Sequence, residues 1–208
     1  MSSTAPEPAD DDPGGHGPGA ETGPSLTPYF LILFGSSAGL ASIIVLLAEL
    51  RDHLGFSETE IGLAIASGFG AAFVACLVMA PHADRGHAPA MLRAGLALGV
   101  AGMVLLAVGT DLWHYMLGRA VFGFALGTAG PAARRTVIVA DPDNLGRNMG
   151  RLGAWDVGGF VAGPMIAAGL SAIGGFRFTF WAMAVGMGLL LPLAFRAQPD
   201  TAARDDAG

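Results

Sequence analysis

Long runs of apolar residues alternate with short polar segments along most of this chain. Six such runs, of 18 to 22 residues each, lie at 29–50, 61–79, 92–109, 112–133, 152–173 and 178–195. A helix needs about 20 apolar residues to cross the hydrocarbon core of a bilayer. The pattern therefore predicts an all-α, multi-pass membrane protein with six transmembrane helices.

Polar signals between the runs mark where the helices turn. Residues 57–60 read Ser-Glu-Thr-Glu, a capping box that predicts the start of the second helix. Further turns are expected at the polar hinge 80–87, at 110–111, at the Asp-Pro-Asp-Asn segment 141–144 and at 174–177. Residues 1–27, rich in Pro, Gly, Ser, Thr and acids, are expected to be a disordered tail. A six-helix domain over 28–196 and a polar tail over 197–208 complete the predicted organisation.

Composition agrees with a membrane protein and limits its partners. Hydrophobic residues make up 52% of the chain and charged residues only 13%, about half the charged share of soluble domains. The formal charge is -6, but five of the acids stand in the first 27 residues, so the charge belongs to a tail. We expect contact with membrane lipids and none with nucleic acid.

The arginines indicate the orientation of the helices. Six helices place both ends of the chain on one side, and that side carries eight arginines against two, Arg51 and Arg177, on the other. Cytoplasmic loops of membrane proteins carry the excess of basic residues. We therefore expect both termini in the cytoplasm and the protein in the cell membrane.

Two charged residues fall inside apolar runs and are candidates for function. Arg119 lies about seven residues into the fourth run, and placing it there costs at least ~2.5 kcal/mol on insertion scales. It is expected to face a wet cavity or a carboxylate, with Glu49 as the first partner to test. The alternative is that its long side chain reaches the outer headgroups. Asp156 is a candidate carrier of a proton or cation, or else pairs with Arg151 or Arg147.

Three stretches of the sequence resemble a known family. Segment 83–86 reads Ala-Asp-Arg-Gly, segment 119–127 begins Arg-x-x-x-Gly, and segment 159–164 reads Gly-x-x-x-Gly-Pro. Together they resemble the N-terminal six-helix half of the major facilitator superfamily. The resemblance covers roughly residues 28–196, although Ala80, His82 and His87 depart from the usual form of the first motif.

The resemblance implies roles for individual residues. It assigns a gating loop to Asp84, Arg85 and Gly86, where a carboxylate can hold a neighbouring helix end in one conformer. The alternative is that this loop only sets topology. Helix packing or bending is implied for the small residues and the proline of the other motifs, Gly123, Gly159, Gly163 and Pro164.

These implications lead to an expected function. Two inverted three-helix repeats would form half of a secondary transporter that moves a small solute by alternating access. The Gly-Pro pair at 163–164 favours proton-coupled efflux. Because the family's substrate path lies between two halves, we expect a second copy or a separately encoded C-terminal half as partner. The alternatives are a non-transporting six-span scaffold that binds partners, or a fragment of a transporter.

Catalytic and metal chemistry are not predicted. The histidines lack neighbours with metal-ligand spacing, and no nucleophile has a histidine within reach, so we expect neither an enzyme nor a cofactor. The single cysteine, Cys76, stands inside an apolar run and is expected to be a buried, inert thiol.

Overall fold

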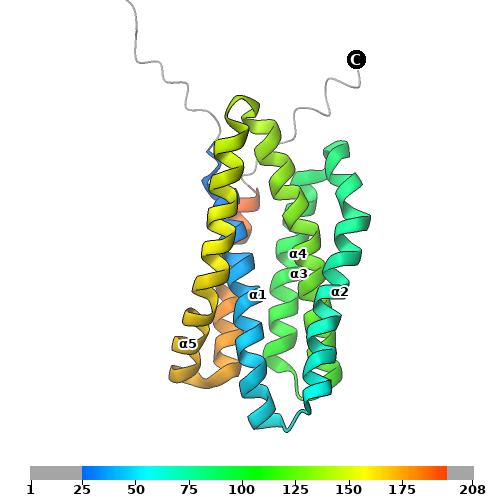
Figure 1. Ribbon diagram of the computed structural model, residues 1–208, viewed down its shortest axis with the longest axis vertical. Helices are drawn as coiled ribbons and strands as arrows, with labels where there is room; N and C mark the ends of the chain where they lie inside the picture. The colour runs from blue at the N-terminus through cyan, green and yellow to red at the C-terminus, as the bar shows by residue number, and fades with distance from the viewer. Residues whose placement is uncertain (1–24, 196–208) are drawn as a thin grey trace, which may run out of the picture.

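The computed structural model describes residues 25–195, which form a bundle of long helices (Figure 1). The chain is all-α within these residues, as predicted. Both expected tails, apart from residues 25–27, lie outside the described residues. The elements in chain order are α1 (Thr27–Leu54), α2 (Glu58–His82), η1 (Ala83–His87), α3 (Ala88–Val108), α4 (Leu112–Ala140), η2 (Pro142–Asn144) and α5 (Leu145–Phe195).

Helix α5 consists of two segments that meet at Gly175. The backbone of this glycine has φ 76° and ψ 179°, a conformation open essentially to glycine alone, and it falls in the turn expected at 174–177. Figure 1 shows the first segment in yellow and the second, in orange, returning in the opposite direction. With α1 to α4, the described residues thus hold six long helical segments.

Three stretches among the described residues are long and apolar enough to cross a membrane. They are Thr27–Leu47, Glu58–Val108 and Pro142–Phe195. The second contains α2 and α3 with the reversal between them, and the third contains both segments of α5. The protein is therefore a membrane protein with long apolar helices. Helix α4 has 29 residues, enough to cross a bilayer, but it carries Arg119, Arg134 and Arg135.

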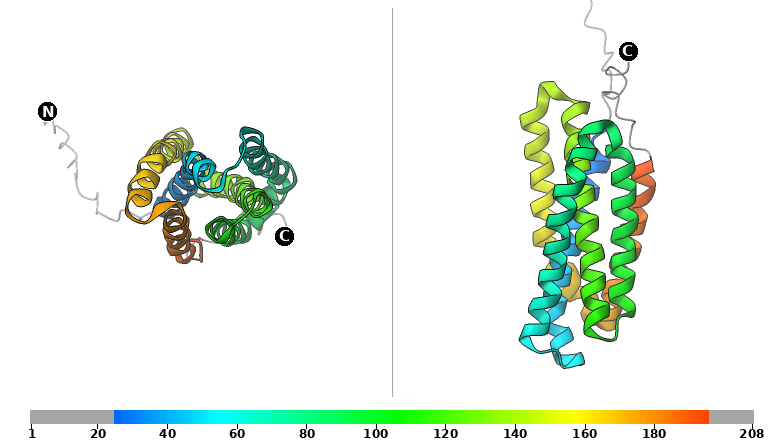
Figure 2. Two further views of the ribbon diagram at one scale, coloured as in Figure 1. Left: turned by 90° about the horizontal axis from the view of Figure 1, so that it is seen from below. Right: turned by 90° about the vertical axis from the view of Figure 1, so that its right-hand side faces the viewer.

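The helices form one bundle with a shared hydrophobic core. Helix α1 packs mainly on α5, while α2 and α3 both pack on α4, and α3 also contacts α5. Helices α1 and α4 lie centrally when the bundle is seen along its length (Figure 2). The two helical turns η1 and η2 lie at the end of the bundle where the described chain begins and stops (Figure 1).

Glycines allow two of these helix pairs to approach until their backbones touch. A Cβ atom at Gly123 of α4 would overlap the carbonyl oxygen of Gly68 on α2. A Cβ at Gly159 of α5 would overlap the carbonyl of Phe34 on α1 in the same way. Next to this second contact, Ser42 Oγ donates a hydrogen bond to the carbonyl of Gly163, at 2.9 Å. Small residues have this effect in membrane helices generally.

Two boundaries differ from the predictions. Helix α4 does not end near Ala133 but continues to Ala140, and α5 begins at Leu145, earlier than the predicted start at 152. The hinge expected over 80–87 is also narrower, because the backbone leaves the helical conformation only from Arg85 through Gly86 to His87, the residue before α3. By contrast, the capping box is present as predicted: Ser57 and Glu60 each bond the other's backbone amide.

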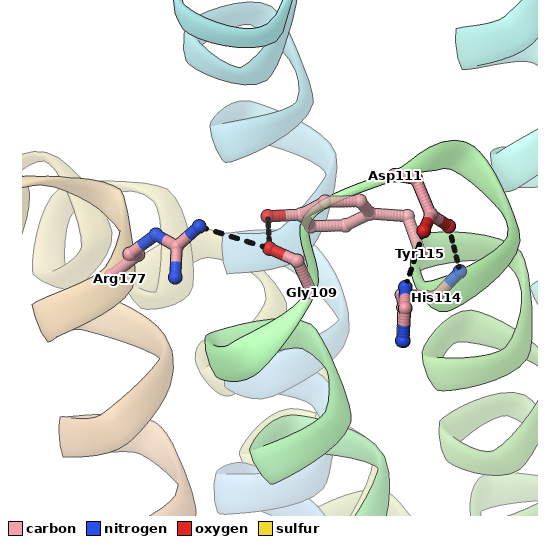
Figure 3. A network of polar contacts seen from close by, with 5 residues as sticks. All are labelled: Gly109, Asp111, His114, Tyr115 and Arg177. Carbon is pink, nitrogen blue, oxygen red and sulfur yellow. Dashed lines mark hydrogen bonds and ion pairs between the residues drawn. The ribbon is translucent and has the colours of Figure 1, made fainter.

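At the opposite end of the bundle, one carbonyl joins three elements (Figure 3). The oxygen of Gly109, which follows α3, accepts hydrogen bonds from Tyr115 of α4 at 3.3 Å and from Arg177 of α5 at 3.1 Å. Asp111 caps α4 and accepts from the backbone amide of His114, which lowers the pKa of its carboxyl. This network holds the turns of that end against each other.

Gly86 provides a test of the hinge geometry. Its φ of 83° lies in the left-handed region, so Gly86→Ala is expected to cost about 1–2 kcal/mol of stability. The matched control is Gly62→Ala, at an exposed position of α2 with nothing within 4 Å of the added atom. There alanine is expected to stabilise the helix by up to ~1 kcal/mol. Thermal unfolding in detergent measures both, and equal midpoints would contradict the left-handed turn.

Candidate functional site

Arg119 is held in the interior between α2 and α4. Its residue is 1% exposed, and its Nε donates to the carbonyl of Ala64 at 3.4 Å. The guanidinium carbon lies 5.8 Å from the centre of the Phe69 ring. Gly68 leaves room for the charge, since a Cβ there would stand 3.0 Å from the guanidinium. The terminal nitrogen Nη2 is buried and has no hydrogen-bond partner among the described residues.

A cavity of about 250 Å3 opens beside this guanidinium. We call it the α2–α4 cavity, because most of its walls come from those helices. Within residues 25–195, its lining is largely apolar, with two arginines and no carboxylate. The lining residues are Leu40, Gly68, Phe69, Ala72, Cys76, Arg119, Gly123, Leu126, Gly127, Pro131 and Arg134.

Asp156 lies on a second, smaller cavity of about 170 Å3 between α1, α4 and α5. Its Oδ2 accepts from Arg134 Nη2 at 3.3 Å, and its Oδ1 accepts from Ser37 Oγ. The carboxylate keeps 31% of its side chain exposed and the arginine 47%. Buried Ser36 Oγ lines the same cavity and finds no hydrogen-bond partner in the described part of the chain. We call this the α1–α5 cavity.

The two cavities adjoin, since Leu40, Leu126 and Arg134 line both. Arg134 therefore stands between Arg119 on one side and Asp156 on the other. The structure thus places these three charged groups of α4 and α5 along two adjoining cavities lined by α1, α2, α4 and α5. Charged groups of this kind in a membrane protein are expensive and mark solute or proton paths.

The pairing expected between Arg119 and Glu49 is not formed. Glu49 faces α5, where its Oε2 accepts from Ser171 Oγ at 2.6 Å. The alternative for Arg119, a side chain that reaches the headgroups, is also wrong, because the residue is enclosed by protein. Asp156 likewise has Arg134 as its ion-pair partner in the described residues, in place of the expected Arg151 or Arg147.

The hinge residues lie apart from both cavities. Asp84 is 73% exposed in its side chain and has Arg135 of α4 near it, with Oδ1 and Nε 3.9 Å apart. This distance is within ion-pair range but too long for a hydrogen bond. Asp84 thus faces the end of α4, a stretch that the sequence pattern predicts to be a loop.

Sequence reasoning missed several members of the site. Arg134 is one of the eight arginines that the sequence pattern predicts at the water surface on the side of the termini, and the pattern gives Ser37 and Gly68 no role at a cavity. Cys76, expected to be buried, is exposed and lines the α2–α4 cavity. The one sequence signal at Gly68 is its place beside Phe69 in a glycine-rich segment. That signal does not indicate Arg119, because the arginine stands on α4, far away in the sequence.

Comparisons with a protein family and with known proteins give matches over most of the chain. The profile of the Major Facilitator Superfamily matches residues 29–208. The chain is 23% identical over 179 residues to a putative uncharacterized transporter, YgaY, of Escherichia coli (strain K12), covering 84% of this chain and 45% of that protein. It is 31% identical over 163 residues to the multidrug resistance protein MdtG of Dickeya zeae (strain Ech586), covering 77% and 37%. The chain thus spans less than half the length of these relatives.

Proposed function

We propose a function from one premise: the chain belongs to the major facilitator superfamily. That family consists of transporters and not of enzymes. We propose that the chain forms one half of a secondary transporter, with six spans arranged as two inverted three-helix repeats, and that it moves a small solute by alternating access. The transporter names of its relatives support this function.

The observation that carries the proposal is the cluster of charged side chains on the two adjoining cavities. Arg119 is buried in the bundle, and Arg134 and Asp156 line the cavities with part of their side chains exposed. A charge among apolar helices of a membrane protein is costly to keep unless it is used. A scaffold that only binds partners at its surface needs none of them. The cavities therefore favour passage of a solute over a purely structural role.

We assign proton coupling to Asp156. Its carboxylate is partly exposed on the α1–α5 cavity and is held by Arg134 and Ser37. Proton uptake would neutralise the carboxylate and release Arg134 from its ion pair. Efflux in exchange for protons is the favoured direction, on the Gly163-Pro164 pair and on the name of the multidrug resistance relative.

The outer faces of α2 and α5 are the surfaces proposed for the second half of the transporter. Large apolar side chains there are exposed, including Phe73 at 65% and Met165 at 75%. A second copy of the chain or a separately encoded C-terminal half would cover them, with lipid on the remaining faces. We place the protein in the cell membrane with both termini cytoplasmic, on the distribution of its arginines.

Inverted membrane vesicles test the transport function even while the solute is unidentified. Respiration acidifies their lumen, and a fluorescent amine reports the proton gradient. When small anionic, cationic and neutral solutes are added in turn, at least one is expected to release lumenal protons beyond the level of vesicles without the chain. Cross-linking of the same vesicles identifies the partner by mass. If none of the added solutes moves protons although the chain is present in the membrane, the result would contradict a proton-coupled transporter.

A further inference from the structure

Resting on the transport function above, we propose that the α2–α4 cavity binds a small organic anion, whose carboxylate accepts hydrogen bonds from Arg119. The proposal begins with an unsatisfied donor. Arg119 Nη2 is buried without a partner in the described residues, while the residue as a whole is 1% exposed and lines the cavity. Buried donors in native proteins are nearly always bonded, so an unbonded one on a cavity points to a ligand acceptor.

The charge of Arg119 is also without compensation. Arginine does not lose its proton in proteins, so the guanidinium stays cationic. Over residues 25–195 no carboxylate lines the α2–α4 cavity. The two acids expected inside apolar runs have other partners: Glu49 accepts from Ser171, and Asp156 pairs with Arg134. The carbonyl of Ala64 and the face of Phe69 solvate the cation only in part. A bound oxyanion would supply both the missing acceptor and the opposite charge.

The remaining walls indicate the body of this anion. Leu40, Phe69, Leu126 and Pro131 are apolar and surround a space of about 250 Å3. That is slightly below the usual range of small-molecule pockets, roughly 300–1,000 Å3. The cavity therefore suits a carboxylate carried on a single ring or a short branched chain. A cationic compound is disfavoured there, because the uncompensated charge of Arg119 would repel it, whereas the charge of Arg134 is offset by Asp156.

The chain offers its own reporter for occupancy. Cys76 is its single cysteine and lines the same cavity, so a bound ligand will shield it from a maleimide. Three probes share one ring and differ in charge: benzoate, benzamide and benzamidinium. We expect benzoate to slow the labelling of the full chain in detergent. At ten times its dissociation constant the slowing is about tenfold, since only the unoccupied fraction reacts. Benzamide is expected to protect weakly and benzamidinium not at all.

Variants assign the protection to Arg119. Arg119→Gln is expected to abolish the protection by benzoate. Arg177→Gln is the matched control, because Arg177 also donates to a carbonyl, that of Gly109, but lies outside the cavity. Its protection is expected to equal that of the unmodified chain. Equal protection by all three probes, protection by benzamidinium, or no protection by benzoate would each overturn the proposal. These comparisons use the unmodified chain, so they decide the matter even if Arg119→Gln fails to fold.

The two proposals fail in different ways. If benzoate protects Cys76 but no solute moves protons in vesicles, the anion site stands and the coupled transport does not. If solutes move protons but benzoate leaves the labelling rate unchanged, the transport stands and the anion site is wrong.

Discussion

An Asp156→Asn variant is expected to lose coupled proton movement in vesicles, down to the level of membranes without the chain. Asparagine has nearly the shape of aspartate and keeps a hydrogen-bond acceptor for Ser37, but it cannot take up a proton. It also leaves Arg134 without its ion-pair partner, whose Oδ2 lies 3.3 Å from the guanidinium. The loss is therefore expected in the proton signal, while the amount of protein in the membrane stays close to normal. Quantitative blotting of the same vesicles measures that amount.

Asp111→Asn is the matched control for this substitution. Asp111 caps α4 at the end of the bundle away from η1 and η2, and asparagine caps helices about as well as aspartate. Proton movement is therefore expected to stay unchanged in this variant. Full activity of Asp156→Asn at equal protein level would show that another group carries the proton.

Gly123→Ala is expected to give the largest loss of stability. The added methyl group would overlap the carbonyl oxygen of Gly68. Neither can rotate away, because the methyl carbon is fixed directly on one helix backbone and the oxygen is part of the other. Overpacking of this kind typically costs about 1–3 kcal/mol, and contact with a backbone places it at the upper end. Gly159→Ala should behave alike, through the carbonyl of Phe34. The stability of both variants is measured as the fraction of protein that stays monodisperse after heating in detergent, and the temperature at which half remains is the midpoint.

Gly169→Ala on α5 serves as the control for these two variants. Its glycine is exposed, and nothing lies within 4 Å of the added atom. Alanine there is expected to be neutral or stabilising, by up to ~1 kcal/mol. A midpoint for Gly123→Ala that matches that of Gly169→Ala would contradict the close contact of α2 with α4.

The family and the helical architecture were predictable because apolar length, turn residues and motifs are local signals. Long apolar runs located the helices, and Ser57 with Glu60 identified the start of α2. The sequence pattern predicts the end of α4 too early, because Arg134 and Arg135 directly follow the apolar run and indicate a water-exposed end. Charge does not stop a helix, however, and the sequence has neither Gly nor Pro between Arg135 and the turn at 141–144.

The partners of the charged residues could not be predicted in the same way. Distance along a helix gives the depth of a residue, but the direction in which its side chain points depends on how that helix rotates against its neighbours. Glu49 is the expected partner of Arg119 because both lie toward the same membrane face, yet Glu49 faces α5 and Arg119 faces α2. The partners expected for Asp156, Arg147 and Arg151, are near it in the sequence, whereas the arginine that it contacts, Arg134, comes from α4. The adjoining cavities arise only from this three-dimensional packing.

The contact of Gly123 with Gly68 has a mechanical consequence for the proposed transport cycle. Helices that touch through their backbones cannot slide or part by small adjustments of side chains, so α2 and α4 will move as one body. The α2–α4 cavity beside Arg119 is lined mostly by these two helices, so its shape is expected to stay the same from one conformational state to the next. A solute bound in this cavity would move together with α2 and α4. Its entry and exit would then depend on the parts of the transporter that face the open side of the cavity.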